Sequence, residues 1–275
     1  MAAASSYPTQ EIDKFGGLPE FSFFCPDMDV FPPTIFDHLL VILLGVALPL
    51  FAVFRSQPGM KNLRFDTPTK IALYWGNSLS LWVATLSVGL VWWFSGRAFA
   101  ELGFQPPRTS ASSSWPWLTA AFVLLYLFDC VFQLSTPERR TKTKAHWRKN
   151  TPFLPQTGRE LRHFSFLAIS AAFGEEVIFR TYFISYLLFF MGNTTTGKVS
   201  AVLIPAAVFA FSHFYQEWKA VLKIVAMAVL FGAIFLLARS LWVLISLHFL
   251  VDLGGGLLAM RMLRGEEKNL ELSKE

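Results

Sequence analysis

The sequence predicts an all-α protein, a polytopic bundle of about seven helices that cross a lipid bilayer. Two observations lead to this fold class. Of the 275 residues, 53% are hydrophobic and only 16% are charged, whereas soluble domains carry about 25% charged residues. The apolar residues also lie in long blocks, and about 20 helical residues are enough to span a hydrocarbon core about 30 Å thick.

Seven apolar blocks are expected to form the spanning helices, and they fall at residues 36–54, 71–94, 115–134, 161–190, 199–214, 221–238 and 241–262. The fourth block is long enough to tilt or break, and the fifth is short for a full crossing. We therefore expect an acidic extramembrane tail over 1–35, a helix bundle over 36–262 and a cytoplasmic tail over 263–275. The sequence contains no internal repeat and no stretch typical of a separate soluble domain.

The loops orient this bundle, because Lys and Arg are retained on the cytoplasmic side of a membrane. Loops 55–70 and 135–160 and the segment after residue 260 are rich in these residues and fall on one side. The amino terminus is therefore expected outside and the carboxyl terminus in the cytoplasm. The compact size of the chain and the lack of a targeting segment favour a prokaryotic plasma membrane over an organelle. The run from Arg139 to Lys149 is interpreted as a solvated loop.

The net charge of +5 is explained by these loops and does not indicate a nucleic-acid partner. Binding to nucleic acid would need a basic stripe interleaved with aromatic residues, which the sequence lacks. We therefore expect the bilayer and a membrane-anchored peptide or protein as partners. The oligomeric state stays open.

Charged side chains inside a membrane are costly and usually have a functional reason to be there. The fourth block contains Glu175, Glu176 and Arg180. Glu176 and Arg180 share a helix face and are expected to form an ion pair. Glu175 is turned by about 100° around the helix and is not expected to take part in that pair. One arginine cannot neutralise two buried carboxylates, which favours a chemical role for Glu175 over a structural clamp. Asp129 and Lys223 are expected to be interfacial or paired structural residues.

Two histidines extend this set of intramembrane groups. His213 ends the fifth block, and His248 and Asp252 lie four residues apart in the seventh, so this pair can point into one site. Phe209 precedes His213 by four residues and can shield its imidazole from water. A single intramembrane histidine is commonly a satisfied hydrogen-bonding residue, but two histidines together with two glutamates favour catalysis.

Other classes of peptidase carry different sequence motifs. The sequence has no His-Glu-x-x-His zinc motif and no Gly-x-Ser-x-Gly nucleophile elbow. Instead, three short motifs in order resemble the CAAX prenyl endopeptidase and bacteriocin-processing (CPBP, Abi) family, which includes the Ras-converting enzyme. The resemblance covers about residues 115–262. The motifs are E-E-x-x-x-R from Glu175 to Arg180, F-x-x-x-H from Phe209 to His213, and H-x-x-x-D from His248 to Asp252.

The resemblance implies an intramembrane endopeptidase that hydrolyses a prenylated or bacteriocin-type substrate anchored in the membrane. It implies that Glu175 and His213 activate a water, and that His248 with Asp252 stabilises the tetrahedral oxyanion. The family's third motif usually ends in Asn, with Asp also accepted.

The supporting residues and the cofactor follow from the same resemblance. Glu176, Arg180 and Phe209 are expected to support the site. The identity of any metal is left open, because the three candidate ligands also suit a zinc site with an open position for water, and we favour a mechanism without metal. These candidate ligands are Glu175, His213 and His248.

Two alternatives from other classes remain at this point. One is a non-catalytic membrane scaffold or immunity protein that keeps the fold and binds a membrane partner. The other is a proton-coupled transporter that uses the same glutamate and histidines as a relay, although such transporters usually contain two similar halves.

Overall fold

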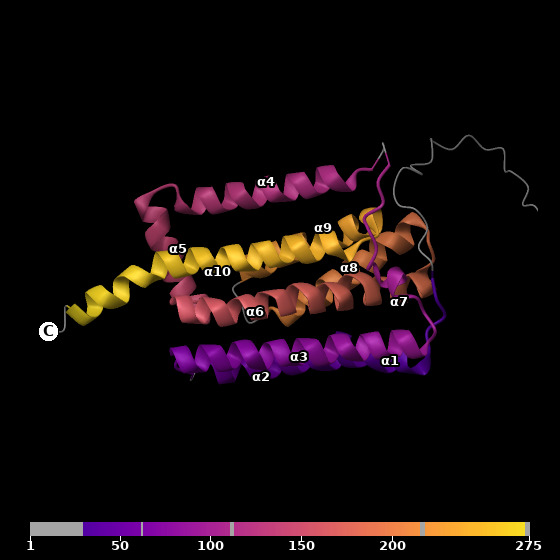
Figure 1. Cartoon of the computed structure of the whole chain (residues 1–275), viewed down its shortest axis with the longest axis horizontal. Helices are drawn as coiled ribbons and strands as arrows, with labels where there is room; N and C mark the ends of the chain where they lie inside the picture. The colour runs from indigo at the N-terminus through magenta and orange to yellow at the C-terminus, as the bar shows by residue number, and fades with distance from the viewer. Residues whose placement is uncertain (1–29, 62, 111–112, 215–217, 273–275) are drawn as a thin grey trace, which may run out of the picture.

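The computed structural model describes residues 30–61, 63–110, 113–214 and 218–272. Within these ranges every regular element is helical, which confirms the predicted all-α polytopic bundle. Figure 1 shows the long helices side by side along the longest axis, with α4 at one edge and α1 to α3 at the opposite edge. Most of the predicted acidic tail, residues 1–29, lies outside the described residues.

The helices follow the predicted apolar blocks closely. In chain order they are α1 (Ile35–Ile42), η1 (Leu43–Ala47), α2 (Leu48–Lys61), α3 (Thr67–Phe94), η2 (Phe99–Leu102), α4 (Trp115–Leu134), α5 (Pro137–Asn150), α6 (Gly158–Glu175), η3 (Glu176–Tyr182), α7 (Phe183–Met191), α8 (Thr195–Ser212), α9 (Trp218–Ala238) and α10 (Leu241–Leu272). The elements η1 and η3 are π-helical turns inside longer helices, and η2 is a 3₁₀ turn.

Six helices among the described residues are long and apolar enough to cross a membrane by length and composition. They correspond to six of the seven predicted blocks. The remaining block is a continuous helix from Gly158 to Met191, formed by α6, η3 and α7, which runs through the same bundle (Figure 1). This helix differs from the others because it carries Glu175, Glu176 and Arg180 of the predicted site.

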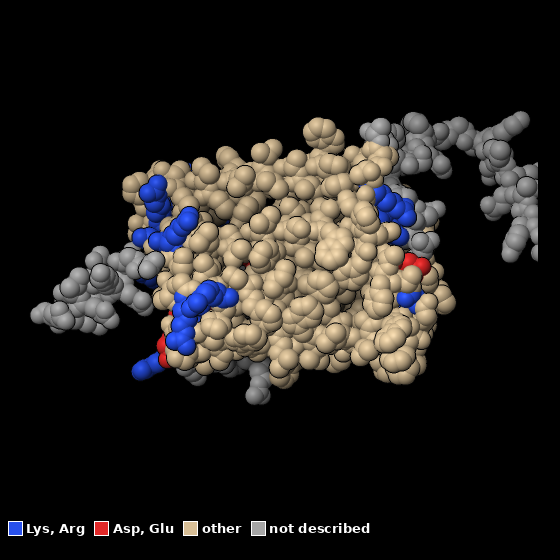
Figure 2. All heavy atoms as spheres, viewed as in Figure 1, with Lys and Arg blue, Asp and Glu red and all other residues tan. Residues whose placement is uncertain are grey.

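The outer surface agrees with a protein embedded in lipid. Figure 2 shows Lys and Arg gathered toward the two ends of the visible face, with a broad band of uncharged residues between them. Helix α4 exposes large apolar side chains along this band, including Leu124, Phe128 and Val131, which are 67% to 68% exposed. Lipid tails can cover such a surface, whereas exposing it to water is unfavourable in free energy. The predicted orientation and the prokaryotic membrane stay predictions.

The segment Arg139–Lys149 is exposed over most of its length, but the prediction of a loop is wrong, because Pro137–Asn150 forms helix α5. Thr136 caps this helix by accepting a hydrogen bond from the Arg139 amide. Proline suits the first turn, and the basic residues of the last turn, Arg148 and Lys149, complement the helix dipole. A run of charges can therefore be helical when its ends are capped.

Small residues bring the helices of the predicted site into close contact. A Cβ atom at Gly174 of α6 would lie 2.7 Å from Thr85 Oγ1 of α3, and one at Gly256 of α10 would lie 2.5 Å from Phe164 of α6. Larger side chains would push these helices apart. Gly174 therefore admits a neighbouring helix, and α6 lies between α3 and α10.

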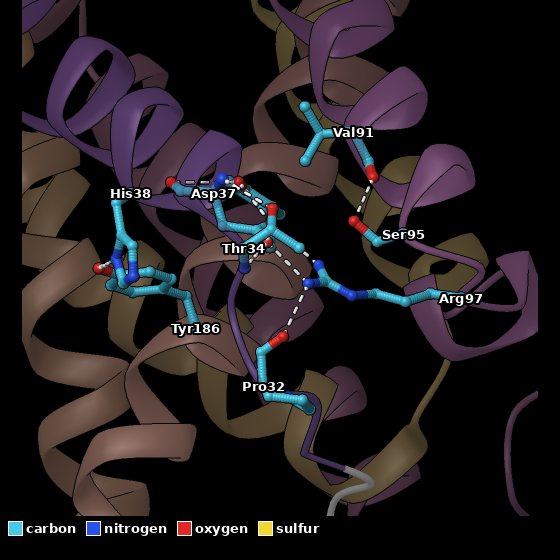
Figure 3. Close-up of polar contacts among 9 residues, drawn as sticks. Pro32, Thr34, Asp37, His38, Val91, Ser95, Arg97 and Tyr186 are labelled. Carbon is cyan, nitrogen blue, oxygen red and sulfur yellow. Dashed lines mark hydrogen bonds and ion pairs between the residues drawn. The ribbon is translucent and has the colours of Figure 1, made fainter.

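A buried ion pair connects α1 to the segment that follows α3 (Figure 3). Arg97 donates to both carboxylate oxygens of Asp37, at 2.9 and 2.7 Å, and also to the Pro32 carbonyl at 3.1 Å. Tyr182, the last residue of η3, donates to the same carboxylate at 3.0 Å. Asp37 is only 1% exposed. This contact fixes one end of the π-helical segment that carries the site.

Replacing Asp37 by Ala is expected to destabilise the protein by about 2 kcal/mol, because the Arg97 guanidinium would lose a bidentate charged hydrogen bond. Unfolding in detergent, followed by circular dichroism with denaturant, measures the change. Asp129→Ala is the matched control, since it removes an ion pair whose side chains are 63% and 42% exposed, and such pairs contribute about 0 to 1 kcal/mol. Equal effects of both variants would contradict the stabilising role given to Asp37.

Candidate active site

A cavity of about 1170 Å³ lies among the helices of the bundle. Most of its wall is apolar, which suits a lipid-like or peptide ligand. Its ionisable side chains come from six of the predicted blocks and include every candidate catalytic residue. They are Tyr74, Tyr126, Asp129, Glu175, His213, Lys223, His248 and Asp252.

The E-E-x-x-x-R motif stands where the α-helix changes into a π-helical turn. Glu175 is the last residue of α6, and Glu176 and Arg180 both lie in η3. The predicted pair is present, with Arg180 Nε 3.1 Å from Glu176 Oε2 and both side chains at most 1% exposed. The Arg180 guanidinium also lies 5.0 Å from the centre of the Phe209 ring. Such π-helical turns occur frequently at functional sites.

His248 of α10 is at the centre of the site. Its Nδ1 lies 2.8 Å from Glu176 Oε1. A carboxylate paired with an arginine accepts hydrogen bonds, so Nδ1 carries a proton and donates a hydrogen bond to Glu176. The other ring nitrogen, Nε2, lies 3.7 Å from Glu175 Oε2 and 3.7 Å from Asp252 Oδ2. The structure therefore brings the two candidate catalytic carboxylates to one nitrogen of His248.

His213 lines the same cavity from the end of α8. Its Nδ1 lies 2.8 Å from the Phe209 carbonyl oxygen, which can only accept, so Nδ1 is the donor. In a neutral ring with its proton on Nδ1, Nε2 is an acceptor. The Phe209 ring lies 4.6 Å from the imidazole, centre to centre, so the predicted shielding of His213 is present.

Sequence reasoning missed the part of the cavity wall that comes from the first two spans. Leu44 of η1 and Asn77 and Ser80 of α3 line the cavity, although they lie outside the expected core at 115–262. Tyr126 of α4 was also missed, and its hydroxyl donates to the carbonyl of Val251, next to Asp252. Polar residues on one face of an otherwise apolar helix are the signal that identifies such wall positions.

The three candidate metal ligands do not form a metal site in this arrangement. In the described part of the chain, no group of three or more His, Cys, Asp or Glu side chains is placed to hold a metal ion.

The bundle and its buried glutamate and histidine cluster define an integral membrane protein with a polar site inside its helices. Residues 158–254 match the model of the family described as type II CAAX prenyl endopeptidase Rce1-like. The match runs from α6 to the middle of α10, and the predicted resemblance is confirmed over this range. All three motifs lie within it. No curated protein and no solved structure gives a significant match to the chain.

Proposed function

We propose that this protein is an intramembrane endopeptidase that cleaves a prenylated, membrane-anchored peptide or protein. The observation that carries the proposal is the convergence of Glu175 and Asp252 on His248 Nε2 inside a largely apolar cavity. The match of this same segment to the Rce1-like family supports protease chemistry. The cavity is large enough for a lipid-modified peptide, since ligand pockets commonly measure about 300 to 1,000 Å³.

A protein that only binds a membrane partner would not need the proton-transfer groups that line this cavity. In the proposed reaction a water lies between the Glu175 carboxylate and His213 Nε2. Glu175 takes a proton from this water, and the resulting hydroxide attacks the carbonyl carbon of the scissile amide. The carbon–oxygen bond that forms places a negative charge on the former carbonyl oxygen.

His248 is placed to stabilise this oxyanion. When both ring nitrogens carry protons, Nδ1 donates to Glu176 and Nε2 donates toward the cavity. A hydrogen bond to developing charge is most effective in a site that excludes water. Asp252, 3.7 Å from Nε2, faces the same oxyanion and contributes a donor when protonated. The intermediate then collapses, the amide bond breaks, and Glu175 returns its proton to the leaving amine.

A cleavage assay tests this function. The purified protein in detergent is given a peptide that contains S-farnesylcysteine and three further residues, the same peptide without the farnesyl group, and a bacteriocin-type leader peptide. We expect cleavage of the farnesylated peptide alone, detected by mass spectrometry, and we expect it to survive removal of metals by a chelator. Loss of cleavage with chelator and recovery with zinc would contradict the metal-free mechanism. Folded protein that cleaves none of the peptides would contradict the proposed function.

A further inference from the structure

The outer surface where α3 packs against α6, the α3–α6 seam, carries cations at one end and apolar side chains next to them. On α6, Arg159, Arg162, His163 and Phe166 are spaced three, four and seven residues from the first, so they share one face of the helix. None of these four side chains is among the residues that line the catalytic cavity. The α3–α6 seam is therefore a surface separate from the proposed active site.

Trp75 of α3 contacts this face of α6. Its indole Nε1 donates a hydrogen bond to His163 Nδ1 at 3.1 Å, and its ring lies 4.7 Å from that of Phe166, centre to centre. An indole nitrogen can only donate, so Nδ1 of His163 accepts and the proton of the neutral imidazole is on Nε2. Trp75 is 49% exposed, and tryptophan is enriched at the level of the lipid headgroups. The contact therefore places the cations of the seam at that level, with His163 Nε2 as a further donor.

The charge at the seam is not neutralised by the carboxylate nearest to it along the chain. That carboxylate belongs to Glu160, which is buried against Lys70 and accepts a hydrogen bond from Thr67. Arg159 and Arg162 are both exposed at the start of α6. The exposed apolar side chains of α6 begin seven residues after Arg159, about 10 Å along the helix axis. A phospholipid has the same order of groups, with a phosphate at the surface and acyl chains beneath it.

We propose that the α3–α6 seam binds one anionic phospholipid. Its headgroup phosphate contacts Arg159 and Arg162 and accepts a hydrogen bond from His163 Nε2, and an acyl chain lies along Phe166 and Ile169, which are both 37% exposed. A choline headgroup also has a phosphate, but its cation would lie against the two arginines. The predicted orientation puts this end of α6 in the cytoplasmic leaflet, where anionic lipids attract basic residues. The inference does not depend on the proposed peptidase activity.

The test measures lipid binding to the purified protein in detergent by native mass spectrometry. Dioleoylphosphatidylglycerol and dioleoylphosphatidylcholine are the probes, because they have the same acyl chains. We expect the first phosphatidylglycerol to bind at least about tenfold tighter, since each Lys or Arg near an anionic headgroup contributes about fivefold. Arg159→Gln/Arg162→Gln should bring this ratio close to one, and Arg159→Lys/Arg162→Lys should keep most of it. Lys142→Gln/Lys149→Gln is the matched control, because it removes two exposed cations from α5 at the same end of the bundle (Figure 1).

The outcomes separate a defined lipid site from a diffuse basic surface. Equal binding of both lipids by the wild-type protein, which needs no variant, overturns the inference. The same loss of preference in the α5 control overturns it as well, because net charge would then explain the binding. Glycerol 3-phosphate has the phosphate without acyl chains, and if it displaces the lipid at equal concentration the seam is a site for free phosphate. Phosphatidylglycerol should also raise the melting temperature of the wild-type protein and of the α5 control, but not that of the double arginine-to-glutamine variant.

Discussion

A Glu175→Gln variant is expected to fold like the wild-type protein and to lose cleavage by at least about a hundredfold, since a general base contributes about 10² to 10⁴ in rate. Glutamine has the shape of glutamate but cannot take a proton from water. Folding should be retained because the buried ion pair of the motif uses Glu176, not Glu175. Steady-state kinetics with the farnesylated peptide and a thermal melt of the same sample measure both quantities.

Asp252→Asn is the matched control for this experiment. It makes the same change from carboxylate to amide, at the same 3.7 Å distance from His248 Nε2. Asparagine can donate to an oxyanion, so we expect a loss within about tenfold. Full activity in Glu175→Gln would contradict its role as the base. Equal large losses in both variants would indicate that the site needs negative charge and not a particular proton acceptor.

The parts of the site that follow from helical spacing could be predicted from the sequence. Glu176 with Arg180 and His248 with Asp252 are pairs at i and i+4, and both are in contact in the structure. The expectation that Asp129 and Lys223 are interfacial or paired structural residues is a different kind of prediction, and in the structure the two pair with each other. It followed from the cost of isolated charges in an apolar helix and not from any knowledge of their separation.

The contact between Glu176 and His248 could not be predicted in this way. The two residues are 72 positions apart, and spacing within a helix says nothing about how α10 turns relative to η3. Helical spacing also predicts a single partner for Glu176, namely Arg180, whereas in the structure its two carboxylate oxygens contact Arg180 and His248. The π-helical turn that starts at Glu176 has no reliable signature in the sequence, because it depends on how α6 packs against its neighbours.

Replacing Glu176 by Met is expected to destabilise the protein by about 3 to 5 kcal/mol, because it leaves the Arg180 charge buried without its carboxylate. Arg180 is 1% exposed, so water cannot take the place of that partner. Cleavage should also be lost, since His248 Nδ1 would no longer have an anionic acceptor. Denaturant unfolding in detergent measures the free energy, and the farnesylated peptide reports the activity.

The double variant Glu176→Met/Arg180→Met separates these two effects. Replacing both members of a buried ion pair by apolar residues is often close to neutral for stability, so we expect most of the lost free energy of unfolding to return. Cleavage should stay low, because His248 still lacks the group that directs Nε2 toward Glu175 and Asp252. A double variant that cleaves like the wild-type protein would mean that Glu176 only neutralises Arg180. Stability regained without activity would instead establish Glu176 as the residue that positions His248.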